Sequence, residues 1–507
     1  SGGRNTAIGS NALTDCTSGQ NNVCVGSNAG ENITTSENNV AVGHDAMEEN
    51  TTGNNNIAIG ARALEENTTA SNNTAVGYEA LTANTTGARN TALGSTSLDA
   101  NTTGENNTAV GQQALGANTT ASGNTAVGRS ALLVNTTGSA NVAVGASALD
   151  ANTTGGSNTA VGHEALSANT TAAQCVAVGN QALEANTTGN YNVAVGSQAL
   201  QSNTDGTLNT AVGLQALEAN VSGQKNAAFG TEALQANTAS NNTAFGRRAG
   251  KANTTGTEIV AVGQGALESN TTASYNTGVG CNALNLNTTG LRNTAVGNNA
   301  LAANVDGGEN TAFGSEALED NTSSIRNTAM GRAALASVSS GSNRHVAIGF
   351  AALASLTGGN ENTVIGNEAG NVMTSASNNT LVGSYCGDAI TTGGDNTSVG
   401  AQSLSASTTG ASNSAFGQAS LNLNTTGSSN TAYGQGSLRN NTTGASNIAV
   451  GKDALQANTT AGDCVAVGKN ALYTNTTASR NTAVGSGAQQ LTTTGTDNTA
   501  VGSAALG

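Results

Sequence analysis

Residues 90–106 read NTALGSTSLDANTTGEN, and units of this form recur every 17 residues along the chain. A glycine marks the phase of each unit: TAVG ends at Gly77 and Gly111, and TALG ends at Gly94. About thirty units follow one another, with one spacing of 16 residues and one of 18. This period is too short for a two-helix repeat, so each unit is expected to form one solenoid coil. We interpret the marker glycines as turn residues with positive φ.

Within the unit, residues 91–93 form a β-rich stretch that Gly94 closes. A second short extended piece is predicted around residues 97–98, and Asn-Thr-Thr-Gly at 101–104 predicts a turn. Repeated glycines and Thr/Asn clusters exclude a helical repeat because these residues are poor helix formers. The predicted fold is therefore all-β, a parallel β-solenoid of about thirty coils that spans residues 1–507 as one continuous domain without end caps.

Two columns of asparagine run through the repeat, one four residues before the marker glycine and one seven residues after it. In the second column, large aliphatic residues replace asparagine in several units, which predicts a dry interior position. Stacked amides can hydrogen-bond from coil to coil and so satisfy polar groups in a narrow core. We therefore predict two structural asparagine ladders, represented by Asn73, Asn90 and Asn107 in the first column and by Asn84, Asn101 and Asn118 in the second.

The leucine four residues after the marker glycine varies together with the second asparagine column. Gly30 and Gly387 replace this leucine in units that carry Ile33 and Ile390 in place of asparagine. Volume lost at one position is restored at the other, as close packing requires if both side chains share one cavity. Gly250 departs from the pattern because its unit keeps asparagine.

Composition and spacing exclude several classes of function. The 507 residues carry a formal charge of −15, with only 9% charged and 2% aromatic residues. Lysine and arginine are not clustered, so nucleic acid is not an expected partner. No apolar run reaches the length of a membrane span, so no membrane insertion is expected in this segment. No cysteine, histidine or glycine motif has spacing suited to a metal, a catalytic base or a phosphate, so we predict no enzyme, no cofactor and no metal site.

For three sets of residues, a functional role is an alternative to a purely structural one. The cysteines are expected to be small buried residues, with a disulfide between Cys16 and Cys24 as the alternative. A broken row of carboxylates is expected to be a solvated face, with calcium binding as the alternative. The Asn-Thr-Thr turns match the N-glycosylation acceptor, but an inward-facing asparagine would be hidden from modification. The carboxylate row comprises Glu65, Asp99, Asp150, Glu184, Glu218 and Glu268.

The units NTAVG, NVAVG at 141–145 and NIAVG at 447–451, each followed by a small residue and leucine, resemble the YadA-like head repeats of trimeric autotransporter adhesins. Similar repeats are found in phage tail-fibre proteins. The resemblance covers the whole chain and implies a left-handed parallel β-roll in which three chains pack side by side. It assigns no catalytic residue. This sequence differs in its longer units and lacks the coiled-coil stalk and membrane anchor of that family.

These features favour a structural, adhesive fibre or filament, located outside the cell or at its surface. Neither face of the predicted strand is charged, which predicts lateral self-association as a homotrimer, and uncapped coils predict head-to-tail assembly. A receptor on a host surface or in a matrix is the other expected partner. The first alternative is the shaft of a phage or virus tail fibre, within a virion. The second is ice binding through the strand threonines Thr74, Thr91 and Thr108, although valines interrupt this row.

Overall fold

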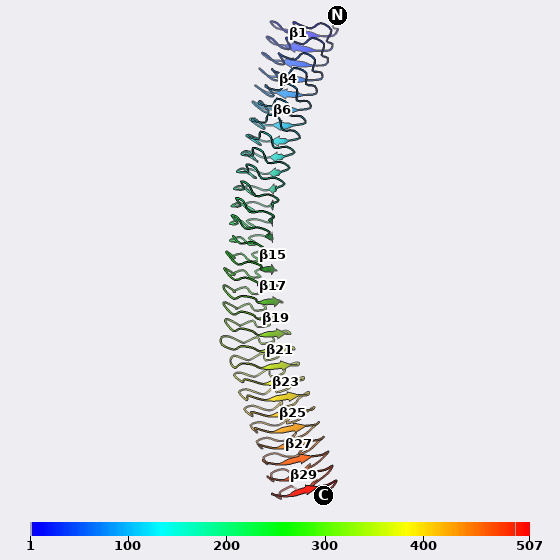
Figure 1. The fold of residues 1–507 in the computed structure, drawn as a ribbon, viewed down its shortest axis with the longest axis vertical. Coiled ribbons are helices and arrows are strands. Elements are labelled where there is room, and N and C mark those ends of the chain that lie inside the picture. Colours follow the sequence, from blue (N-terminus) through cyan, green and yellow to red (C-terminus); the bar gives the residue numbers. More distant parts are fainter. Residues whose placement is uncertain (1–2, 492, 507) are drawn as a thin grey trace. The chain divides into compact units, whose positions relative to one another are not determined.

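The computed structural model describes residues 3–491 and 493–506. The chain forms two compact units, Ser1–Thr255 and Gly256–Gly507. Each unit is a parallel β-solenoid in which every coil contributes one strand of three residues (Figure 1). The predicted all-β solenoid fold is therefore confirmed, with thirty strands and no helix among the described residues.

The strands of both units are short and evenly spaced along the chain. The first unit contains β1 (Thr6–Ile8), β2 (Val23–Val25), β3 (Val40–Val42), β4 (Ile57–Ile59), β5 (Thr74–Val76), β6 (Thr91–Leu93), β7 (Thr108–Val110), β8 (Thr125–Val127), β9 (Val142–Val144), β10 (Thr159–Val161), β11 (Val176–Val178), β12 (Val193–Val195), β13 (Thr210–Val212), β14 (Ala227–Phe229) and β15 (Thr243–Phe245). The second unit contains β16 (Val260–Val262), β17 (Thr277–Val279), β18 (Thr294–Val296), β19 (Thr311–Phe313), β20 (Thr328–Met330), β21 (Val346–Ile348), β22 (Thr363–Ile365), β23 (Thr380–Val382), β24 (Thr397–Val399), β25 (Ser414–Phe416), β26 (Thr431–Tyr433), β27 (Ile448–Val450), β28 (Val465–Val467), β29 (Thr482–Val484) and β30 (Thr499–Val501).

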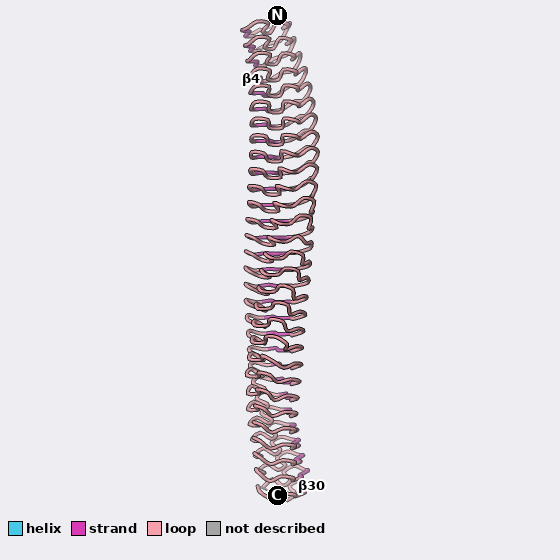
Figure 2. Tube along the Cα trace, turned by 90° about the vertical axis from the view of Figure 1, so that its left-hand side faces the viewer, coloured by secondary structure: helices cyan, strands magenta, loops and turns pink. Residues whose placement is uncertain are grey.

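Within each unit, every strand pairs in parallel with the strand of the next coil. Between β5 and β6, Ala75 lies opposite Ala92 and Val76 lies opposite Leu93. Residues of the same phase therefore stack on one another, so each sequence column becomes a continuous row of side chains. Figure 2 shows that the strands take up one short part of each coil and that turns make up the rest.

The prediction of a second extended piece around residues 97–98 is wrong. The chain forms a corner there, with positive φ at alternate residues: 50° at Thr96 and 54° at Leu98. The Leu98 amide donates to the carbonyl oxygen of Ala114 in the next coil at 2.9 Å, so the corners are joined by hydrogen bonds without forming a strand. Leucine seldom adopts positive φ, and the complete burial of its side chain offsets the strain.

The marker glycines make the sharp bend between the strand and the corner. Gly77 and Gly94 have φ of 141°, and Gly111 has φ of 131°. A Cβ atom built on Gly94 would lie 2.5 Å from the carbonyl oxygen of Gly111 in the next coil. Only glycine fits, because both the backbone conformation and the close approach of the next coil exclude a side chain.

The core of each coil is thin and consists mainly of small residues. Ala75, Ala80 and Leu81 are completely buried and represent three core columns. Where glycine replaces the leucine at Gly30, Gly370 and Gly387, a large apolar residue of the second asparagine column fills the space. The Gly250 coil keeps asparagine there. A Cβ on Gly30 would lie 2.9 Å from Cδ1 of Ile33, so the two positions share one cavity, as the correlated substitutions indicated.

Candidate functional site

The first asparagine column joins side chains to the backbone of neighbouring turns. Asn73 is completely buried, and its Oδ1 accepts a hydrogen bond from the backbone amide of Asn90 at 2.8 Å. Its Nδ2 donates to the carbonyl oxygen of Gly87 at 3.0 Å. Asn90 and Asn107 repeat this arrangement one and two coils further on. The column therefore fixes each turn against the strand that follows it.

The second column is an amide-to-amide ladder. Nδ2 of Asn101 donates to Oδ1 of Asn84 at 2.8 Å, and Nδ2 of Asn118 donates to Oδ1 of Asn101 at 2.9 Å. The same Nδ2 of Asn101 also donates to the carbonyl oxygen of Gly104 in its own turn at 3.1 Å. Both amide hydrogens are therefore in use, and these side chains are completely buried. A glycan on this nitrogen is incompatible with the folded coil, although the sequence matches the acceptor motif.

The outward face of the strands carries no charge in either unit. Val127 and Val144 are each 36% exposed, while the alanine in the middle of their strands points inward and is buried. Across the described strands, the outward residues are threonine, serine, alanine, methionine, aliphatic or aromatic residues. Some aromatic residues stack on this face: the rings of Phe229 and Phe245 are 4.6 Å apart at their centroids. The face is a continuous uncharged stripe on each unit.

The histidines lie in separate places. His345 is completely buried in the first asparagine column, whereas His44 pairs with the neighbouring Asp45 at 2.7 Å. His163 lies 3.5 Å from Glu164 and contacts Asn180 of the next coil at 3.5 Å. No two histidines come together in the described part of the chain to form a catalytic or metal-binding pair.

The cysteines are free thiols at scattered phases of the repeat. Cys175 and Cys464 replace asparagine in the first column, and their Sγ atoms lie 3.2 Å and 3.3 Å from the turn carbonyl oxygens. Burial raises the pKa of both thiols, which keeps them protonated and unreactive. Cys16 and Cys24 are not bonded to each other, and burial raises the pKa of Cys24 to about 12. Cys281 is the exposed thiol of the set.

The predicted carboxylate row lies on the corner side of the coils, and its members are half-buried. One member, Glu65, lies close to two further acids: single carboxylate oxygens of Asp45, Glu48 and Glu65 are all within 4.8 Å of one another. Burial, with the charges of its neighbours, raises the pKa of Glu48. Arg62 balances part of this charge, since its Nε is 2.7 Å from Glu65. Sequence reasoning missed this grouping because it joins two columns of adjacent coils.

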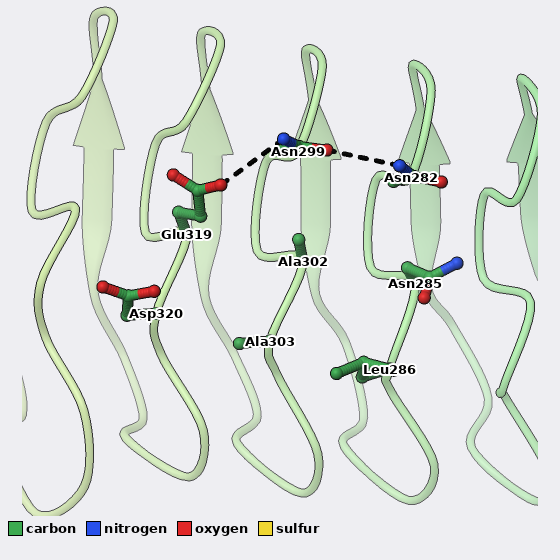
Figure 3. Close-up of a pocket in the computed structure, with 8 residues that line it drawn as sticks. All are labelled: Asn282, Asn285, Leu286, Asn299, Ala302, Ala303, Glu319 and Asp320. Carbon is green, nitrogen blue, oxygen red and sulfur yellow. Dashed lines mark hydrogen bonds between the residues drawn. The ribbon is translucent and has the colours of Figure 1, made fainter.

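A hollow of about 310 Å³ opens on the corner side of the second unit (Figure 3). It exists because Ala302 and Ala303 lie between coils that carry larger side chains at the same phases. Asn282 donates to Asn299, and Asn299 donates to Glu319, each at 3.4 Å. Burial, followed by the charges of nearby acids, raises the pKa of Glu319. The residues lining the hollow are Asn282, Asn285, Leu286, Asn299, Ala302, Ala303, Glu319 and Asp320.

No protein-family model and no curated protein matches the sequence. No helix in the described residues is long and apolar enough to cross a membrane.

Proposed function

We propose that this chain is a non-catalytic, structural and adhesive segment of an extracellular or cell-surface fibre, and that copies of it associate side by side, as a trimer, through their strand faces. The observation that supports the proposal is the uncharged stripe on each unit. No strand contains a charged residue, whereas the corners and turns carry all of the charges. The resemblance to YadA-like head repeats supports the same arrangement.

The size of the stripe is sufficient for a stable contact. Each strand of three residues is roughly 10 Å long, and fifteen coils spaced by about 4.8 Å give roughly 700 Å² for each unit. A typical stable interface buries about 800 Å² on each partner. In a trimer, each chain shares its two stripes between two neighbours, which leaves roughly 700 Å² for each contact and falls within the range of stable interfaces. Copies could therefore associate without any additional domain, and such a fibre could present its turns to a host-surface or matrix receptor.

The association can be tested with charges placed on the stripe. In the variant Val127→Lys with Val144→Lys, lysine replaces two outward strand residues, and association should weaken because two buried charges would lack partners. The variant Gln112→Lys with Asn180→Lys places the same two charges on exposed corner residues and serves as the matched control. Light scattering and mass per length by electron microscopy report the number of chains. A wild-type particle of one chain would contradict the proposal.

Ice binding is the second candidate, and the exposed strand threonines support it. Thr74 and Thr108 are half-buried, and Thr91 is exposed on the outward face, in register from coil to coil. A phage or virus fibre shaft would use the same stripe and is distinguished by its source. A thermal-hysteresis assay tests ice binding directly: activity in a monomeric sample would favour it, and no activity would exclude it.

A further inference from the structure

One turn in the second unit has a notch between two large aliphatic side chains. Six residues before the marker glycine, most coils carry a small or polar residue. Leu291 and Ile325 are the large aliphatic residues of this column, and Gly308 lies between them. The space above Gly308 is a hollow of about 230 Å³. The residues lining it are Thr289, Leu291, Arg292, Asp306, Gly308, Glu309, Ile325 and Arg326.

The dimensions of the notch suit one hydrophobic side chain. Leu291 and Ile325 stand two coils apart, a separation of roughly 10 Å between their backbones. Leu291 is 42% exposed, so apolar surface faces the notch without a covering group. An isobutyl group placed over Gly308 would contact both aliphatic walls and bury apolar area on each side.

The rim of the notch carries charges in a definite arrangement. On one side, Nε of Arg326 pairs with Glu309 at 2.8 Å. The hydrogen bond and charge of Arg326, with a smaller contribution from Arg292, lower the pKa of Glu309. Arg292 itself lies over the ring of Tyr275, 5.7 Å from its centroid. This side therefore has two guanidinium groups for one carboxylate and favours an anion. Asp306 lines the notch as an exposed carboxylate and favours an N–H donor.

We propose that this notch binds a leucine-like residue with a free carboxylate, either a free amino acid or the C-terminal residue of a peptide. The side chain enters between Leu291 and Ile325, the carboxylate meets Arg292, and the nitrogen of the ligand donates to Asp306. This inference does not depend on the fibre function, because every residue involved lies on the turns and none lies on the strand face.

Binding can be measured by NMR titration of the full chain with leucine, N-acetylleucine and N-acetylleucinamide. Dissociation constants in the millimolar range are expected for the two carboxylates, because one buried side chain and one charged contact give modest affinity. Removing the carboxylate should weaken binding at least tenfold. Tighter binding of leucine identifies a free amino acid as the ligand, and equal or tighter binding of N-acetylleucine identifies a peptide C-terminus. N-acetylleucinamide binding as tightly as N-acetylleucine would overturn the inference.

Two variants test the position of the site. Gly308→Val fills the notch and should abolish binding, and Arg292→Gln should weaken it at least severalfold. Gly394→Val is the matched control, because Gly394 occupies the same phase between Ser377 and Ala411 and offers no aliphatic walls. A Cβ atom built on Gly308 would lie 3.0 Å from the carbonyl oxygen of Leu291 in the previous coil, and one built on Gly394 would lie 3.0 Å from that of Ser377. The two valine variants therefore impose the same local strain. Unchanged binding by Gly308→Val would refute the assignment.

Discussion

Acid should weaken the coil that contains His345. This histidine replaces asparagine in the first column, and its Nδ1 accepts a hydrogen bond from the Asn362 amide at 3.2 Å. Its Nε2 lies 3.2 Å from the carbonyl oxygen of Gly359. A neutral imidazole with its proton on Nε2 therefore reproduces both hydrogen bonds of the asparagine side chain. A second proton on Nδ1 would face the Asn362 amide, so that two donors oppose each other.

The surroundings of the imidazole are uncharged. Its side-chain contacts are Ser342, 2.9 Å from Nε2, and the Asn362 amide group, 3.4 Å from Nδ1. The charged residues beside this column in sequence, Arg344 and Glu361, pair with each other at 2.8 Å on the surface. Among the residues that the structure describes, no carboxylate contacts the imidazole to stabilise its protonated form.

The size of the stability loss in acid follows from the shift in the pKa of His345. Burial lowers the pKa of His345 from 6.5 to about 4, and the hydrogen bond to the Gly359 carbonyl opposes the effect. Because the folded pKa is lower, the unfolded state binds more protons between those two values. The stabilisation is complete above pH 6.5 and is lost as the pH falls toward 4. The difference between the two pKa values corresponds to about 3 kcal/mol.

Hydrogen exchange measured by mass spectrometry can report this loss for the single coil. Protection of the segment 345–362, corrected for intrinsic exchange, should fall on the order of 100-fold more between about pH 7.5 and about pH 4.5 in the wild type than in His345→Asn. The asparagine variant restores the usual ladder residue and therefore controls for titration elsewhere in the chain. Equal acid responses of the two proteins, or a His345 pKa near its ordinary value by NMR, would refute the reasoning.

Three further substitutions test the packing of the coils. Gln489 occupies the leucine column and is 1% exposed, and its side-chain amide has no hydrogen-bond partner among the described residues. Gln489→Leu should therefore raise the free energy of unfolding by about 1–3 kcal/mol in urea denaturation; a decrease would show that the side-chain amide is satisfied in solution. Gly94→Ala should destabilise by about 3 kcal/mol or more, because residue 94 needs positive φ and lies against the next coil; wild-type stability by the same assay would contradict the role of the marker glycine. Ile33→Ala should cost about 2–5 kcal/mol by leaving a cavity above Gly30, and a cost below 1 kcal/mol would show that the coil collapses to fill it.

The strand register and the interior columns could be predicted from the sequence because the repeat compares each position with itself many times. Substitution of asparagine by Ile33 or Ile390 indicated an interior position, and both residues are completely buried. The corner could not be predicted in this way. Positive φ at Leu98 recurs at the same phase in most coils, but leucine gives no local signal for it. The conformation comes from the stacked hydrogen bonds between corners, which are a property of the assembled solenoid.

The two hollows could not be predicted from the sequence either, because each is formed by residues of the same column in three successive coils. Ala302 is small for its column, in which most coils carry a larger polar residue, and it makes a hollow because Asn285 precedes it and Glu319 follows it by one coil. Motif searches look along the chain and miss this pattern. Comparison of neighbouring residues within one column, as for Gly308 between Leu291 and Ile325, provides the missing signal.

The two irregular coils indicate which part of the repeat is free to change. In the coil of 16 residues, the first-column side chain of Asn226 still donates to a turn carbonyl oxygen, that of Ala239, at 2.8 Å. In the coil of 18 residues, Asn327 donates to the corresponding carbonyl oxygen of Ser342 at 3.2 Å. The strands on either side keep their parallel register in both cases. Length changes are therefore absorbed by the turn after the second asparagine column, while strand, bend and corner stay fixed. Because the turn tolerates variation at little structural cost, it is where recognition sites can arise in this fold, and the notch at Gly308 lies on that side of the coil.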